Sequence, residues 1–414
     1  MKKKIWILNH YAGRMLFDRG GRHYCFAKYL VRDGYEPVIF CCNNKHNPGT
    51  ENFYETDTLW EEHVAEEINT PFVFVKGRPY IGNGKDRVLN MIDFYHNVKK
   101  AALEYAAENG KPDVVYASSV HPLTLVAGIQ LAKRFGVKCV CEVRDLWPES
   151  LISYGIAKKD SLAVKLLRAL EKWTYTKADS IIFTMEGAYE YIIEQGWEKR
   201  IPRSKVHFIN NGVDLETFQQ NEQDFQIQDP DLENSQYFKV IYTGTIKKAN
   251  RINLLVDAAQ KIDNKKIQIL IWGDGDELQS LKEKAEKEGI RNLVFKGRVK
   301  KEEVPYILSR GDALFLDYFD ETIARFGIRS NKLFEYVAAG KPILMSHITE
   351  HNPASPFGCS LTYESSPEGI AWAIQKVAAL ERASYDVMSE KACEAAKAYS
   401  YSELSRSLEE IIVQ

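Results

Sequence analysis

The feature that most constrains the fold is an alternation of short apolar, β-type runs with amphipathic helical segments along the chain. One set of runs occupies residues 4–9, 37–42, 72–75, 113–117, 137–143, 180–184 and 205–209, and a second set occupies residues 237–243, 267–272, 292–295, 313–316 and 342–345. Helical periodicity is clearest in residues 87–108, 123–135 and 278–287. Continuously apolar strands that alternate with helices predict parallel sheets covered on both faces.

A polar gap separates the two sets of strands. Residues 218–236 are acidic, rich in Gln and Asn and without a clear period, which is typical of a linker. We therefore predict an α/β fold of two doubly wound, Rossmann-like domains that face a cleft, with domains at 1–214 and 237–400 and a linker at 215–236. Residues 401–414 should form a docked C-terminal helix, because four apolar residues recur at helical spacing: Leu404, Leu408, Ile411 and Ile412.

Composition excludes several classes of protein. The chain has 414 residues, of which 45 % are hydrophobic and 27 % charged, as in ordinary soluble enzymes. Its 55 basic and 57 acidic residues argue against a nucleic-acid partner. No run of about eighteen apolar residues is present, so we predict no membrane span.

The chain start and the cysteines predict a cytoplasmic protein. Residues 1–4 are basic like the start of a signal peptide, but the apolar run at 5–8 is too short for one and is predicted to be a strand. The seven cysteines include no C-x-x-C pair. An odd, unpatterned set indicates a reducing compartment, thiols packed as small apolar groups, and no zinc site.

Ligands of such sheets bind outside the carboxyl ends of the strands, so the loops that follow strands are the informative ones. After the first strand, Gly20 and Gly21 lead into a helix. The pair predicts either a phosphate-binding turn at a helix N-terminus or only a tight turn. The dinucleotide fingerprint G-x-G-x-x-G is missing, which argues against a nicotinamide or flavin enzyme.

Two further loops carry polar residues. His121 precedes a proline at the end of a strand, so its ring is expected to face the cleft and polarise a hydroxyl, although a structural role is the alternative. Residues 142–150 place four charges, a Trp and a Pro after another buried strand. There Arg144 is expected to pair with a carboxylate, since an unpaired buried charge is costly, and Asp145 is the expected substrate contact.

The segment 326–342 is the strongest candidate. Ser330 is a favourable N-cap for a helix that should end before Gly340. Lys332 and Glu335 lie three residues apart and share a helix face. The helix N-terminus and Lys332 would bind an anion, while Glu335 could accept hydroxyls of a ribose; the alternative is a surface ion pair.

Taken together, these motifs resemble those of a known family, the retaining glycosyltransferases of GT-B architecture in family 4. The resemblance covers essentially the whole chain and rests on six motifs in order: Gly20-Gly21, VRDLWPES at 143–150, NNGVD at 210–214, Tyr242-Thr243-Gly244, GDGDE at 273–277, and 330–342. The second and last motifs are most similar to the branch that adds acetamido or deoxy sugars during bacterial O-antigen and capsule synthesis.

The resemblance implies a nucleotide-sugar donor, with a UDP-sugar favoured, in the C-terminal domain. It implies that Glu335 binds the ribose, Lys332 the diphosphate, and His121 the donor sugar near the reaction centre. The residues implied as catalytic are His121, Arg251, Lys332 and Glu335. Those implied to bind donor or substrate are Gly20, Gly21, Asp145, Asn211, Gly244, Lys248, Gly273, Arg298, Ser330 and Asn331.

The sequence departs from the family pattern at two places. Gly327 stands where many members have a glutamate that touches the donor sugar, so glucose and mannose are not assumed. Thr245 and Asn250 replace two cations of the donor loop, for which Lys247, Lys248 and Arg251 are the possible substitutes.

The mechanism follows from the diphosphate leaving group, whose growing charge is stabilised by fixed donors and cations. No carboxylate pair of retaining-hydrolase type is recognisable, so we expect front-face attack with the diphosphate as base. The Asp-x-Asp strings at 229–231 and 274–276 lie in the linker and a glycine loop. No metal or cofactor is therefore predicted.

The acceptor is less defined. Residues 162–175 form an amphipathic segment with Lys and Arg among Leu and Trp. It could lie on an anionic membrane and admit a polyprenyl-linked or other glycan acceptor, or it could be an ordinary packed helix. The rival functions are a nucleotide-sugar epimerase of the same architecture and a two-domain binding protein, which should carry an export signal.

Overall fold

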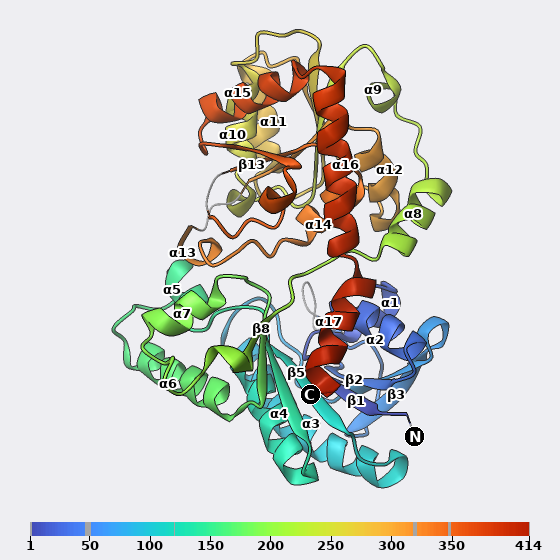
Figure 1. Ribbon diagram of the computed structural model, residues 1–414, viewed down its shortest axis with the longest axis vertical. Helices are drawn as coiled ribbons and strands as arrows, with labels where there is room; N and C mark the ends of the chain where they lie inside the picture. Colours follow the sequence, from blue (N-terminus) through green and yellow to red (C-terminus); the bar gives the residue numbers. More distant parts are fainter. Residues whose placement is uncertain (1, 46–50, 120, 318–320, 347–348, 414) are drawn as a thin grey trace. The chain divides into compact units, whose positions relative to one another are not determined.

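The computed structural model describes residues 2–45, 51–119, 121–317, 321–346 and 349–413. The chain forms two compact units, one of Met1–Asn210 with Tyr401–Gln414 and the other of Asn211–Ser400. In each unit a sheet is covered by helices (Figure 1). The two parallel α/β sheets predicted from the apolar runs are thereby confirmed.

The first sheet has eight strands in the order β3-β4-β2-β1-β5-β6-β7-β8. All pairs are parallel except β3 with β4. The strands are β1 Lys4–Leu8, β2 Glu36–Cys42, β3 Trp60–Ala65, β4 Thr70–Val75, β5 Val114–Ser119, β6 Lys138–Val143, β7 Ser180–Phe183 and β8 Val206–Phe208. The strand β3 was not predicted, because an antiparallel edge strand with a solvated face has no continuous apolar run.

Helices cover both faces of this sheet. They are α1 Gly13–Phe17, α2 Arg22–Arg32, α3 Lys85–Asn109, α4 Pro122–Phe135, α5 Glu149–Ser153, α6 Leu162–Lys177, α7 Ala188–Glu194 and α17 Tyr401–Val413. On one face, α17 lies beside α2 (Figure 1) and buries the four apolar residues that predicted it. The C-terminal helix is therefore part of the first unit.

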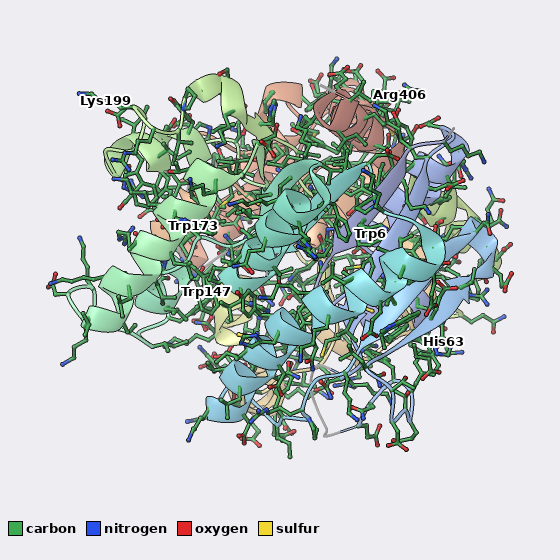
Figure 2. All side chains as sticks on the ribbon, turned by 90° about the horizontal axis from the view of Figure 1, so that it is seen from below. Trp6, His63, Trp147, Trp173, Lys199 and Arg406 are labelled. Atoms are coloured by element: carbon green, nitrogen blue, oxygen red, sulfur yellow. The ribbon has the colours of Figure 1, made fainter. Side chains whose placement is uncertain are left out.

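Successive residues of β1 face opposite layers. Ile5 and Ile7 belong to the core beneath α2 and α17. Trp6 lies between them, is 0 % exposed, and packs on the other face against Tyr105 and Phe135, with ring centres 5.9 and 5.3 Å away. Figure 2 labels Trp6 within this interior. A strand buried on both faces must be apolar at every position, which explains its sequence.

The second sheet has six parallel strands in the order β11-β10-β9-β12-β13-β14. They are β9 Phe238–Thr243, β10 Ile267–Trp272, β11 Leu293–Gly297, β12 Ala313–Leu316, β13 Ile343–Ser346 and β14 Ser360–Tyr363. The helices are α8 Leu215–Asp224, α9 Pro230–Glu233, α10 Ile252–Ala259, α11 Leu278–Lys287, α12 Val304–Ser309, α13 Glu321–Ala324, α14 Asn331–Ala338, α15 Pro367–Ala378 and α16 Arg382–Ala398.

The predicted linker at 215–236 is an ordered part of the second unit, which corrects the expectation of an irregular segment. Its two helices, α8 and α9, insert Phe218 and Leu232 into the core. The side chain of Asp229 caps the start of α9 by accepting hydrogen bonds from two backbone N–H groups. It also accepts a hydrogen bond of 2.8 Å from Nζ of Lys296. Because single buried apolar residues stand among polar ones here, the sequence shows no helical repeat of apolar residues.

In each sheet there is one pair of neighbouring strands from which successive strands are added in opposite directions. In the first sheet this pair is β1 and β5, and in the second it is β9 and β12. Ligands of doubly wound sheets bind outside the carboxyl ends of the strands at such points. The loops that follow β1, β5 and β9 are therefore the expected ligand-binding loops.

Among the described residues, no helix is long and apolar enough to cross a bilayer. All seven cysteines are free thiols. Six are buried as expected, whereas Cys393 is exposed on α16.

Candidate functional site

Two glycine loops lie side by side in the second unit. Gly244 follows β9 and donates its N–H to the Trp272 carbonyl at 3.0 Å, while Gly273 follows β10. A Cβ on Gly273 would stand 1.8 Å from the Gly244 oxygen, and the two φ angles are +144° and +141°. Only glycine satisfies both the conformation and the close approach, so no side chain stands where these loops leave the sheet.

Lys332 of α14 extends over the first of these loops. Its Nζ donates a hydrogen bond of 2.9 Å to the Tyr242 hydroxyl, and a Cβ on Gly244 would lie 3.1 Å from the same Nζ. Burial, together with the charge of Lys247, lowers the pKa of Lys332 to about 7, although the charge of Glu335 opposes the shift. The nearby second cation and the burial both disfavour the charged form of Lys332. A bound anion would favour that charged form again.

Glu335 lies one turn further along α14. Burial raises the pKa of its carboxyl group above the usual value, although the charges of Lys301 and Lys332 oppose the shift. Within the described residues the carboxylate makes no hydrogen bond and no ion pair with Lys332. The alternative of a surface ion pair therefore does not apply, and the acceptor oxygens remain available to hydroxyls.

The start of α14 is held from outside the helix. Ser330 occupies the N-cap position as predicted, but its side chain makes no capping hydrogen bond. Asn211 instead donates from Nδ2 to the Arg329 carbonyl at 2.6 Å, which fixes the preceding loop. Asn331 is the exposed first residue of the helix, which ends before Gly340 as predicted.

Tyr336 joins this helix to the glycine loop. Its hydroxyl accepts the Thr243 N–H at 3.1 Å, so α14 is tied to the last residue of β9. Neither Tyr336 nor Tyr242 was predicted as a site residue, because both occur in apolar runs and are indistinguishable there from core residues. Their hydroxyl groups become informative only when the packing is known.

The cations of the loop between β9 and α10 have different positions. Lys248 opens a single 3₁₀ turn, and Arg251 takes a left-handed conformation, with φ +49°, just before α10. Lys247 is the one whose charge acts on Lys332. Beyond the second glycine loop, Arg298 pairs with Asp274 at 2.8 Å while remaining 81 % exposed.

The two Asp-x-Asp strings are engaged in ion pairs. Asp229 and Asp231 bind Lys296 at 2.8 and 2.6 Å, and Asp274 binds Arg298. Among the residues that the structure describes, no group of three or more His, Cys, Asp or Glu side chains is arranged to hold a metal ion.

In the first unit, His121 is linked to a second histidine. His121 precedes α4, and its Nε2 lies 2.8 Å from Nδ1 of His10, which follows β1. Nε2 of His10 lies 2.7 Å from Oδ1 of Asn90. The sequence predicts a ring open to a cleft, but His121 is 1 % exposed. Burial lowers its pKa to about 3, as does the charge of Arg87, so the ring is neutral.

The Gly20-Gly21 turn leads into a buried ionic cluster. Gly21 has φ +97° and precedes α2, whose first residues, Arg22 and His23, reach Glu142 at 2.7 and 3.2 Å. Burial raises the pKa of Glu142, but the charge of Arg22 and the hydrogen bond from His23 outweigh it and hold the pKa well below its usual range. If the glycine pair forms only a tight turn, the role of that turn is to bring Arg22 and His23 to Glu142.

Arg22 also takes the role expected of Arg144. Its guanidinium donates to the carbonyls of Ile209 and Asn210 at 2.9 and 2.5 Å. Arg144 forms no ion pair in the described part of the chain, although its charge lowers the pKa of Glu142. The expectation for Arg144 is therefore wrong, because Arg22, 120 residues from Glu142 in the sequence, pairs with that carboxylate.

Asp145 lines a small pocket of about 20 Å³ together with Trp147, Glu171 and Tyr175. Burial raises the pKa of Glu171 to about 8, while hydrogen bonds from the hydroxyls of Tyr175 and Tyr191 oppose the shift. The carboxylate of Glu171 is therefore engaged by two tyrosine hydroxyls inside the first unit.

Comparison with known proteins identifies the family of the chain. The model for "Glycosyltransferase Family 4" matches residues 24–217, and the model for "Glycosyl transferases group 1" matches residues 223–394. WbjE of Pseudomonas aeruginosa, named a probable glycosyltransferase, is 29 % identical over 233 residues, and WcaI of Escherichia coli K12, named for glycosyl transfer in colanic acid biosynthesis, is 23 % identical over 213. The alignments span 56 and 51 % of these relatives and 56 and 50 % of this chain, so about half of each.

Solved structures show the same fold. Anabaena HepE in complex with UDP matches with a TM-score of 0.65 and 14 % identity, and each chain is covered in full. An Escherichia coli structure titled trehalose-6-phosphate bound with UDP-2-fluoro glucose matches with a TM-score of 0.72 and 10 % identity, over 100 % of this chain and 99 % of that one.

Proposed function

Because the chain belongs to the GT-B glycosyltransferases of family 4, we propose that it transfers a sugar from a nucleotide-sugar donor to an acceptor hydroxyl with retention of configuration. The observation that carries the proposal is Lys332, which extends over the Gly244 turn with Glu335 one turn further along the same helix. A cation above turns without side chains, and a carboxylate without a hydrogen bond among the described residues, match a diphosphate next to a ribose.

Each group then has a defined task in the donor site. Lys332 and Lys247 neutralise the diphosphate, and Glu335 accepts the two ribose hydroxyls. Ser330, Asn331 and Asn211 shape the start of α14, while Lys248 and Arg251 add positive charge to the donor loop. The exposed Arg298, paired to Asp274, lies beyond Gly273 where the base would be bound.

The chemistry requires stabilisation of the leaving group. When the sugar–phosphate bond breaks, negative charge grows on the diphosphate, and fixed cations lower the barrier by about 3–4 kcal/mol per donor. We propose that the diphosphate accepts the proton of the acceptor hydroxyl, which attacks from the same face. Lys332 and Lys247 supply the charge that a metal ion supplies elsewhere, so the transfer is proposed to need no metal.

The comparisons support a UDP-sugar and a surface polysaccharide. UDP is the nucleotide in the Anabaena HepE structure, and WcaI is named for colanic acid biosynthesis. Gly327 removes a carboxylate from the donor-sugar side, so we propose an acetamido or deoxy sugar, used in O-antigen or capsule synthesis.

We propose that the acceptor is polyprenyl-linked and reached at the inner face of the cell membrane. On α6, Leu162, Leu166 and Trp173 recur at helical spacing and are 72, 63 and 38 % exposed. Figure 2 shows Trp173 on this helix. Lys165 lies beside them and is also exposed, so the face combines apolar and basic groups as membrane-surface helices do.

The proposal is tested by incubating the protein with UDP-sugars and a polyprenyl-diphosphate-linked saccharide. We expect product only when donor and acceptor are both present, with the anomeric configuration of the donor retained in the product by NMR. An epimerase would instead convert the donor sugar without any acceptor. Donor conversion in the absence of acceptor would therefore favour the alternative.

A further inference from the structure

The hydrogen bonds around His121 determine which of its ring nitrogens carries the proton. Asn90 donates from Nδ2 to the Arg78 carbonyl at 2.6 Å and to Asn44 Oδ1 at 2.7 Å. A backbone carbonyl only accepts, so the amide of Asn90 cannot be flipped, and its Oδ1 faces His10. The acceptor Oδ1 then requires a proton on Nε2 of His10.

The same reasoning extends one step further. In a neutral imidazole one nitrogen donates and the other accepts, so Nδ1 of His10 carries a lone pair. Nε2 of His121, 2.8 Å away, must donate to that lone pair. Thr124 Oγ1 lies 3.5 Å from the same Nε2 and can accept from it as well. Nδ1 of His121 is left as an acceptor, and it is a buried atom without a hydrogen-bond partner among the described residues.

We infer that His10 and Asn90 are positioning residues that hold His121 as the Nε2–H tautomer, so that Nδ1 accepts a hydrogen bond from a substrate hydroxyl. The part that concerns the substrate rests on the proposed function, whereas the tautomer does not. The hydrogen bond between the two histidines joins the loops that follow β1 and β5. The strand order of the first sheet changes direction between these two strands. His121 thus acts as a neutral acceptor that orients a hydroxyl, and it supplies no proton.

The tautomer is measured directly by long-range ¹H–¹⁵N correlation spectra of the full chain labelled in its histidine rings. Signals are assigned with the His121→Ala and His10→Asn variants. We expect both His10 and His121 to show a protonated Nε2 and an unprotonated Nδ1 at pH 7. A protonated Nδ1 on His121, or a doubly protonated His10, would overturn the inference whether or not the protein is a transferase.

Two substitutions of His10 separate positioning from packing. In His10→Asn the amide oxygen can replace the accepting Nδ1, whereas His10→Leu offers no acceptor. We expect kcat/KM with a UDP-sugar to fall about tenfold or more in His10→Leu and to stay within about threefold in His10→Asn, with the affinity for UDP alone unchanged in both. His96→Leu, an exposed histidine of α3, is the matched control.

Equal losses in the two His10 variants would show a packing role only and overturn the inference. No transfer by the wild type with any donor would instead count against the proposed function, and the spectra would still decide the tautomer.

Discussion

Nζ of Lys332 lies 2.9 Å from the hydroxyl oxygen of Tyr242 and 4.6 Å from the centre of the same ring. The aromatic face and the hydroxyl together hold an ammonium group above a turn where a side chain could not fit. A lysine so placed is costly to keep charged until an anion arrives. We propose that this relationship makes the site selective for a phosphate ligand.

Binding of UDP should therefore take up a proton. The pKa of Lys332 is about 7, so the group is mostly neutral in the free protein at pH 8, and a bound diphosphate restores its charge. Affinity should accordingly fall as pH rises from 7 to 9. Calorimetry at pH 8 in buffers of different ionisation enthalpy should show uptake approaching one proton.

Lys332→Arg is the control for this prediction, because a guanidinium stays charged throughout this range. Uptake that is equal in Lys332→Arg and wild type would show that another group titrates.

Glu335 should distinguish nucleotides by their ribose. Wild type is expected to bind UDP about tenfold or more tightly than 2′,3′-dideoxy-UDP, because the hydroxyls donate to the carboxylate. In Glu335→Ala the two ligands should bind equally. Glu302→Ala, on a neighbouring surface turn, should leave the preference unchanged. A preference that survives in Glu335→Ala would place the ribose elsewhere.

The paired glycine loops predict a large difference between two glycine substitutions. Gly273→Ala should lower the free energy of unfolding by about 3 kcal/mol or more, because its Cβ would stand 1.8 Å from the Gly244 oxygen. Gly289 has φ +67° and no neighbouring atom within 4 Å of an added Cβ, so Gly289→Ala should cost only about 1–2 kcal/mol. Thermal unfolding of both variants measures the difference, and similar losses would contradict the close approach.

The buried Glu142 cluster should govern acid stability of the first unit. Glu142→Gln leaves Arg22 buried without a counter-charge and should cost about 3–5 kcal/mol, whereas Glu403→Gln, in an exposed pair with Arg406, should cost less than about 1 kcal/mol.

The pH dependence of this cluster has a definite sign. The folded-state pKa of Glu142 is lowered, so its contribution is present above the unfolded value of 4.5 and is lost as pH falls below it. Denaturant titrations should show this loss in wild type and a smaller one in Glu142→Gln. An equal acid loss in both would assign it to other carboxyl groups.

The exposed face of α6 should bind anionic vesicles. We expect wild type to co-sediment with phosphatidylglycerol-containing vesicles but not with phosphatidylcholine alone, and Leu162→Glu with Leu166→Glu to abolish the binding. Val387→Glu, at an exposed apolar position in the second unit, is the control. Undiminished binding of the double variant would show that α6 is an ordinary packed helix.

The sheets were predictable because their strands are apolar at every position. The run at 267–272 coincides with β10, and the run at 4–9 with β1 plus one residue. The strands β3 and β14 were missed because their burial alternates or is partial. The sequence of 215–236 predicts a linker, because a single buried residue such as Phe218 produces no helical repeat of apolar residues.

The site was predictable only where its residues are neighbours in sequence. Lys332 and Glu335 are three apart on one helix, so their shared face follows from the helical repeat. His10 and Asn90 are 80 residues apart, and no local pattern joins them. The polar Asn9-His10 pair directly after the first strand was the one available signal, since polar residues at a strand end suggest a ligand edge.

The most direct test of the donor site is calorimetric titration of wild type and the Lys332→Ala and Glu335→Ala variants with UDP, GDP, ADP and CMP, with and without magnesium. We predict that UDP binds wild type best, that magnesium does not change this affinity, and that each variant binds UDP at least about tenfold more weakly while unfolding at the wild-type temperature. Unchanged UDP affinity in both variants, or no nucleotide binding to wild type, would contradict this prediction.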